Sequence, residues 1–358
     1  MKQRLRTTNE SVLRPVSLAG RRRLALATVA ASLLISSVPL LAQVGGRLDA
    51  RSDAQDARND ALLATPNLAT PQPLSNLYAT APGQEQQVPT PEWRFNVVAP
   101  LGYNSNAEEI ARGGTQTLES TPLGNLSWSA PVGSLPLRLT LNTNAESDRY
   151  FSASEADLDK LGAGARVQYT DPANDQAFSP YFAFAARWDF LPTFSEQISA
   201  RQDFNLGFNK RFNFDGAFRP VPIASDTSAS TVWSFGLTAF LPRREREPQL
   251  SSSAVFVIPS VTYTISKDWN ASFAVDFLSR WFDTDSAGFT GHDSEVLPVG
   301  TLEYVIPAAL IGGERTAMVL GRPALDFQAS YLKVWSNAPG VSYDQWDARV
   351  AIKAGWTF

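Results

Sequence analysis

The chain ends with Arg349-Val350-Ala351-Ile352-Lys353-Ala354-Gly355-Trp356-Thr357-Phe358, and this stretch decides the fold. Its even-numbered positions are apolar throughout, whereas its odd-numbered positions carry charged, small or hydroxyl side chains. Such an alternation predicts a β-strand with one apolar face and one polar face. In a soluble sandwich the apolar face would cover a core, and in a membrane barrel it would face lipid. Periodicity alone does not separate these two folds.

Three further features favour the barrel. The alternation recurs in about a dozen segments, many of about ten residues, the length that a tilted strand needs to cross a bilayer. Small residues and charges share the polar positions, which suits a hydrated lumen. Aromatic residues gather near segment ends, as interface girdles require: Tyr103, Tyr169, Tyr263, Trp269, Trp281, Trp335 and Trp356. The sequence therefore predicts an all-β, transmembrane, antiparallel up-and-down β-barrel over residues 92–358.

Twelve strands are expected, at 93–103, 123–130, 135–144, 159–169, 179–190, 200–212, 231–241, 254–265, 269–281, 297–306, 324–335 and 346–358. An even number places both ends of the barrel in the periplasm and the long connections outside. The connections 213–230 and 307–323 are too long for periplasmic turns, so ten or fourteen strands remain possible.

The start of the chain has the order of an export signal. Basic residues up to Arg23 precede an apolar run, and Pro39 interrupts that run before Ala42. Residues 1–42 are therefore predicted to be a cleaved signal peptide, with an uncleaved anchor helix as the weaker alternative. Residues 43–91 are rich in proline and polar residues, which predicts a disordered periplasmic segment. Within it, alanines at helical spacing allow a short helix over Leu48–Leu63, which a partner could bind.

Composition excludes several kinds of site. The chain has no cysteine, which removes disulfides, thiolate metal sites and a lipid-modified cysteine. The first 42 residues hold seven basic residues and one acidic residue, out of 31 and 35 in the whole chain. The remainder therefore has 24 basic and 34 acidic residues, a net charge of −10. Such an acidic body disfavours nucleic acid as a partner. No cofactor and no metal site are expected.

The polar positions of the predicted strands define the candidate site. If they face the lumen, the pore-lining residues are Arg94, Arg138, Arg166, Arg187, Asp189, Asp203, Arg211, Asp276, Arg280, Glu303, Asp326, Asp347, Arg349 and Lys353. Mixed charges of this kind are typical of a pore that selects small hydrophilic solutes. The alternative is a packed network of ion pairs that fills a narrow barrel.

Three predicted loop features are candidate sites. His292, the only histidine, is expected in an outer loop, away from the lipid-facing wall on which a serine–histidine hydrolase would need it. The acidic run from Asp283 to Glu295 fits a calcium loop poorly, so a solvated loop is favoured. The charged run Arg243–Glu247 is expected to be a solvated loop, with lipopolysaccharide phosphates as the alternative partner.

The two ends of the barrel region resemble known proteins. The terminal Phe358, with Trp356 and the alternating residues before it, resembles the C-terminal signature by which bacterial outer-membrane barrels are recognised for assembly. The stretch 96–106 is similar to the first strand of uncharacterised porin-like families. The resemblance implies an outer-membrane location, with lipid, lipopolysaccharide and the barrel-assembly machinery as partners. The leading hypothesis is a porin-like, non-enzymatic barrel. A plugged surface or scaffolding barrel and an outer-membrane hydrolase are the alternatives.

Overall fold

The computed structural model describes residues 91–107, 109, 114–170, 178–221, 232–247, 251–284, 290–338 and 341–358. The predictions for the signal peptide and for the segment up to residue 90 concern residues outside these ranges. Within the described ranges, no helix is long and apolar enough to cross a membrane.

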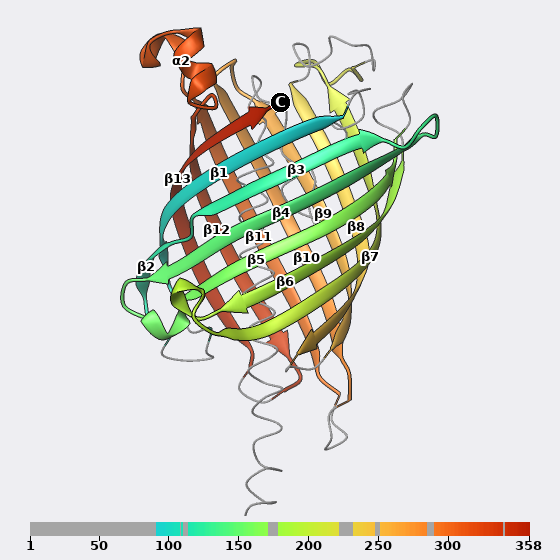
Figure 1. Ribbon diagram of the computed structural model, residues 1–358, viewed down its shortest axis with the longest axis vertical. Helices are drawn as coiled ribbons and strands as arrows, with labels where there is room; N and C mark the ends of the chain where they lie inside the picture. Colours follow the sequence, from blue (N-terminus) through green and yellow to red (C-terminus); the bar gives the residue numbers. More distant parts are fainter. Residues whose placement is uncertain are drawn as a thin grey trace, which may run out of the picture.

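One antiparallel sheet accounts for nearly all of the described chain (Figure 1). Its strands are β1 (Glu92–Asn104), β2 (Thr117–Ser120), β3 (Leu123–Pro131), β4 (Leu137–Tyr150), β5 (Leu158–Tyr169), β6 (Ser179–Phe190), β7 (Gln197–Phe214), β8 (Trp233–Glu247), β9 (Ser252–Thr264), β10 (Trp269–Phe282), β11 (His292–Val305), β12 (Ala324–Ser336) and β13 (Tyr343–Thr357). Strands that are consecutive in the sequence are neighbours in the sheet, apart from the interruption between β2 and β3.

The sheet closes because its first and last strands pair. β1 and β13 are antiparallel partners from Arg94↔Thr357 to Asn104↔Asp347. Beyond that ladder, Trp93 and Phe358 exchange two backbone hydrogen bonds, of 3.2 and 2.9 Å. Closure leaves no unpaired sheet edge, which is the requirement for strands in lipid. The predicted barrel is confirmed.

The barrel has twelve strands in cross-section although thirteen are numbered. β2 and β3 both pair with β1 and with β4, so together they form one strand that is interrupted around Pro122. Proline has no backbone N–H to donate to the ladder, which explains a break at this point. Each of the twelve predicted strands overlaps an observed one, and the open choice between ten, twelve and fourteen strands resolves to twelve.

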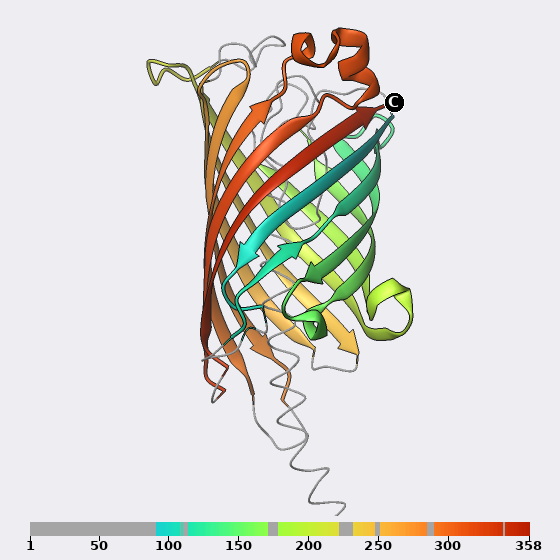
Figure 2. The same cartoon turned by 90° about the vertical axis from the view of Figure 1, so that its left-hand side faces the viewer.

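Both chain ends of the barrel lie at the same edge, here called the terminal rim, and the opposite edge is the loop rim (Figures 1 and 2). The connection 307–323, which is too long for a turn, lies at the terminal rim. It folds into the 3₁₀ helix η4 (Ala308–Ile311) and the helix α2 (Glu314–Val319). The indole N–H of Trp356 donates to the carbonyl of Val319 over 3.1 Å, which fixes this connection to β13.

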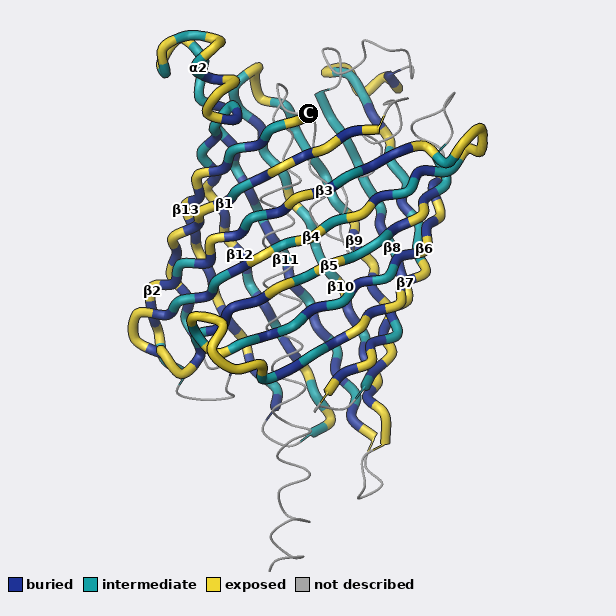
Figure 3. Tube along the Cα trace, in the orientation of Figure 1, coloured by how far each residue is buried: buried dark blue, intermediate teal, exposed yellow. Residues whose placement is uncertain are grey.

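Exposure alternates along the strands (Figure 3). The outer face presents large apolar side chains, for example Leu101, Phe182, Phe273 and Val350, each 47–54% exposed. The opposite face of the same strands is buried and is largely polar. This is the inverse of a soluble protein, and it is the arrangement that lipid outside and a polar lumen inside require. A water-soluble double sheet is excluded.

Candidate functional site: the inner face of the barrel

The residues predicted to line a pore lie on the inner face. Twelve of the fourteen are at most 9% exposed, and the other two, Arg211 and Asp276, are partly buried. Arg211 donates to Asn213 and to Ser234, at 2.7 Å each. The placement follows from strand parity, because side chains two residues apart point to the same side of a strand. Their role in lining a pore remains a prediction.

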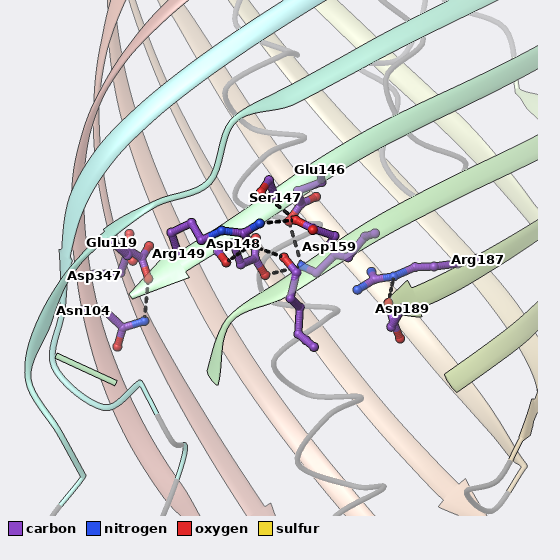
Figure 4. A network of polar contacts seen from close by, with 12 residues as sticks. Asn104, Glu119, Glu146, Ser147, Asp148, Arg149, Asp159, Arg187, Asp189 and Asp347 are labelled. Atoms are coloured by element: carbon purple, nitrogen blue, oxygen red, sulfur yellow. Dashed lines mark hydrogen bonds and ion pairs between the residues drawn. The ribbon is translucent and has the colours of Figure 1, made fainter. Parts of the chain in front are cut away.

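Three cations of the inner face each contact two carboxylates. Lys353 contacts Glu303 and Asp326, joining β13 to β11 and β12. Arg349 contacts Glu119 at 2.5 Å and Asp347 at 2.7 Å, joining β13 to β2. Lys160 lies 2.7 Å from Glu146 and 2.6 Å from Asp148, joining β5 to β4; Figure 4 shows part of these contacts.

The Arg349 cluster depends on a glycine of β1. Gly102 is the register partner of Arg349 on one side and of Glu119 on the other. A Cβ atom at Gly102 would lie 2.6 Å from Cγ of Arg349 and 2.7 Å from the carbonyl oxygen of Ala348. The missing side chain therefore lets Arg349 cross β1 and reach Glu119. This ion pair therefore reinforces the pairing between the first and last strands.

Two aspartates of the inner face show the reverse arrangement, in which one carboxylate contacts two cations. Asp189 on β6 lies 2.7 Å from Arg187 and 3.7 Å from Arg246. Asp203 on β7 lies 3.3 Å from Arg201 and 2.8 Å from Arg244. Each aspartate therefore contacts two arginines, and these clusters occupy β6, β7 and β8.

Four of these clusters form two regions of opposite charge on the inner face. The acid-rich arc comprises the clusters of Lys353 and Arg349 on β11–β13 and β2. Its four carboxylates and two cations give −2. The base-rich arc comprises the clusters of Asp189 and Asp203, and its four arginines and two aspartates give +2. The Lys160 cluster lies beside the base-rich arc, because Lys160 on β5 is the register partner of Asp189 on β6. In the closed strand order β7 lies across the barrel from β13, so the two arcs face each other.

The inner face also carries apolar patches, which the alternation did not predict. Phe240 and Phe256 stack with ring centroids 4.5 Å apart, between β8 and β9. Tyr181 reaches the same patch over Gly207, where a Cβ atom would lie 2.7 Å from Cζ of Tyr181. A second patch joins β11, β12 and β13 and comprises Leu297, Val299, Leu332, Val334 and Tyr343.

The expectation for His292 is wrong. It is the first residue of β11, on the outer face, and is not part of a solvated loop. Its Nε2 lies 2.9 Å from the hydroxyl of Ser279, and its ring stacks on Trp281 at 5.2 Å. Within the described residues, Ser279 is the only hydrogen-bond partner of the ring, and no carboxylate among them orients the imidazole. The described residues therefore provide a nucleophile and a base at this position, without the third group that such sites use.

The two charged loops were also placed wrongly, because β8 and β11 continue further toward the loop rim than expected. Arg244 and Arg246 belong to β8 and face inward, and Asp293 and Glu295 belong to β11 and are buried. Asp283 follows β10 and accepts two hydrogen bonds from Arg243, of 2.8 and 2.7 Å. These bonds lower the pKa of Asp283. The acidic run therefore does not form one solvated loop.

Several charged residues of the two arcs and their surroundings were missed, among them Glu119, Glu146, Asp148, Lys160, Arg201, Arg244, Arg246 and Glu295. Lys160 and Arg201 lie within predicted strands and share the parity of Arg166 and Asp203, so the sequence carries the signal that would have found them. The others lie in segments that the sequence predicts as loops, because a charge at the end of a strand resembles a loop residue.

No family model matches the chain, and no curated protein matches it. Among solved structures, an outer-membrane channel of Pseudomonas putida F1 is similar at 9% identity and a TM-score of 0.44, over 78% of this chain and 100% of the channel. The translocator domain of the autotransporter NalP from Neisseria meningitidis is similar at 8% identity and a TM-score of 0.40, over 89% and 99%. The NanC porin is similar at 10% identity and a TM-score of 0.35, over 72% and 98%.

These identities and TM-scores are too low to transfer a function. The closed barrel and its apolar outer face, described above, place the chain in the outer membrane.

Proposed function

We propose that the barrel passes small hydrophilic solutes or ions across the outer membrane. The observation that supports this is the inner face, where residues of both charge signs replace the apolar residues of the outer face. The acid-rich arc and the base-rich arc face each other. A solute that carries both a positive and a negative group would therefore find a group of opposite charge on each side of the lumen. This interior offers polar contacts along the lumen, whereas a barrel that serves only as an anchor needs no such charges.

Single-channel recording in planar bilayers tests the proposal. The folded protein and a variant without residues 43–88 are reconstituted separately, and a heat-denatured sample serves as the control. We expect discrete conductance steps from at least one folded form and none from the control. If neither folded form ever conducts, the proposed passage of solutes is wrong.

The assembly of the barrel is a separate proposal. Trp356 and Phe358 would form the signal read by the barrel-assembly machinery, and lipid and lipopolysaccharide would contact the outer face. Trp356 stacks on Phe95 with centroids 5.6 Å apart, so the same residues also support the closure of the barrel. Phe358→Ser tests the signal: normal folding in detergent with reduced insertion in cells supports it, and normal insertion in cells contradicts it.

One observation favours the second candidate, a plugged barrel that binds another envelope component. Inner-face charges are almost fully covered, with Arg280 1% and Glu303 0% exposed. A water-filled lumen would leave such side chains open to solvent. This burial and the proposed conduction are compatible if the lumen is closed at rest and a partner opens it.

A further inference from the structure

The connection between β11 and β12 presents exposed apolar side chains at the terminal rim, where α2 stands at one edge of the barrel (Figure 1). Leu310 and Val319 are each 70% exposed, and Met318 and Leu320 are exposed as well. These four residues are called the rim patch. A solvated turn has no need of such side chains. Exposed apolar residues that gather in one place mark a contact with a membrane or with another protein.

The backbone of this connection is hydrogen-bonded and holds the rim patch in a defined shape. The N–H of Gly313 donates to the carbonyl of Ala308 over 2.7 Å, and the N–H of Arg322 donates to the carbonyl of Ala317 over 2.7 Å. Gly312 and Gly313 have φ values of 91° and 95°, which allow the reversal between η4 and α2. The apolar side chains therefore project from an ordered support, and their exposure does not follow from a lack of structure.

The rim patch is continuous with the apolar outer face of the barrel. Trp356 shares the outer parity of Ile352, and its indole N–H donates to the carbonyl of Val319 over 3.1 Å. A Cβ atom at Gly321 would lie 2.7 Å from Cε2 of Trp356, so the chain that follows α2 lies against the indole. Tryptophans of such girdles lie at the level of the lipid headgroups. The C-terminal end of α2 is therefore fixed at the height where the bilayer ends.

The charges of the connection suit an anionic partner. Residues 307–323 hold two arginines and one glutamate, a net charge of +1. Glu314 forms an ion pair with Arg322. Arg315 is exposed, and within the part of the chain that the structure describes it contacts no carboxylate. It lies four positions before Val319 in α2, and residues at this spacing share a helix face. A guanidinium next to an apolar patch matches a phosphate next to acyl chains.

We propose that the connection 307–323 binds phospholipid of the leaflet at the terminal rim. The rim patch enters the boundary between acyl chains and headgroups, and Arg315 contacts the lipid phosphates. Lipid is the occupant that the geometry favours, because Trp356 joins the rim patch to a wall that already faces lipid. The proposal is independent of conduction.

Spin labels on single cysteines test the contact, because the natural chain has no cysteine. Leu310→Cys and Val319→Cys are labelled in the full chain and reconstituted in vesicles of phosphatidylethanolamine and phosphatidylglycerol. Collision of the label with oxygen, which concentrates in lipid, is compared with collision with a water-soluble nickel complex. Lys267→Cys, in the turn between β9 and β10 at the same rim, is the solvated control. Ala329→Cys on the outer face of β12 is the lipid reference.

We expect oxygen to exceed nickel at positions 310 and 319, as at position 329, and nickel to exceed oxygen at position 267. Nickel collision at 310 and 319 that equals the value at 267 would mean a solvated connection and would overturn the proposal. Low collision with both reagents would mean that protein covers the rim patch, either a second copy or another part of the chain, and would equally overturn it.

Charge reversal tests the contact with phosphate. Arg315→Glu is combined with the label at position 319, and Arg315→Lys, which keeps the charge, is the matched control. We expect about a twofold rise in nickel collision for Arg315→Glu, because attraction to the anionic surface becomes repulsion. Arg315→Lys should behave like the natural residue. Equal nickel collision in the two variants would contradict the contact between Arg315 and the phosphates.

Discussion

At the scale of single residues, the closure depends on Gly102. Gly102→Ala places a methyl group against Arg349 and against the backbone oxygen of Ala348, which cannot move aside as a side chain can. Overpacking of this kind costs about 1–3 kcal/mol, and displacement of Arg349 would also weaken its contact with Glu119. We expect a lower urea midpoint for unfolding, measured by the gel mobility of folded and unfolded forms.

A neighbouring glycine provides the matched control. Gly124 on β3 has no atom within 4 Å of a Cβ built on it, so Gly124→Ala should leave the midpoint unchanged. Equal midpoints for the two variants would mean that Arg349 has room to move, and that Gly102 is not required for the pairing of β1 with β13.

The Ser279–His292 pair supports a second prediction at this scale. The hydroxyl of Ser279 contacts the imidazole of His292, and no carboxylate among the described residues orients that ring. We expect no labelling of the folded protein by a fluorophosphonate probe. Labelling that disappears in Ser279→Ala but persists in Ser294→Ala would instead establish a hydrolase on the outer face.

At the scale of strands, the free-energy cost of a substitution depends on whether the residue faces lipid or the lumen. Even-numbered and odd-numbered positions of one strand face opposite sides. Ala329 faces lipid near the middle of β12. Arginine on the lipid face near the midplane costs about 2–4 kcal/mol, and the cost falls toward the interfaces. We expect Ala329→Arg to lower the stability of the barrel in liposomes by an amount in this range, read from urea unfolding. Ala329→Leu, at the same position, should leave it unchanged, and equal stability of both variants would contradict the lipid-facing assignment.

The strands also show how far the sequence predicts the structure. Alternation located all twelve strands, since a period of two over ten residues matches the pleat of a strand and not the turn of a helix. It failed at the ends of β8 and β11, where inward-facing charges such as Arg244 and Glu295 look like loop residues. The inner-face parity placed the charges correctly. The partners of each charge depend on neighbours distant in sequence, as with Lys353 and Glu303, and a single strand contains no information on them.

At the scale of the whole molecule, closure brings together strands that lie at the two ends of the barrel region. Val97 on β1 and Ala354 on β13 are register partners although they are 257 positions apart in the sequence. Their Cα atoms are therefore at the distance of paired antiparallel strands, about 4.5–5.5 Å, which a disulfide can bridge. In a chain without natural cysteines, a bond between these positions can form only if the two ends of the sheet meet.

The double variant Val97→Cys, Ala354→Cys should therefore form a disulfide on mild oxidation of the folded protein, and non-reducing denaturing gels would show a shifted band that reductant removes. Val97→Cys with Lys353→Cys is the matched control, because Lys353 points to the opposite face of β13 and the sheet itself would separate the two thiols. Cross-linking in the first pair alone fixes both closure and register. Equal cross-linking in both pairs would mean a register that slides, and then the row formed by Arg349, Gly102 and Glu119 could not persist.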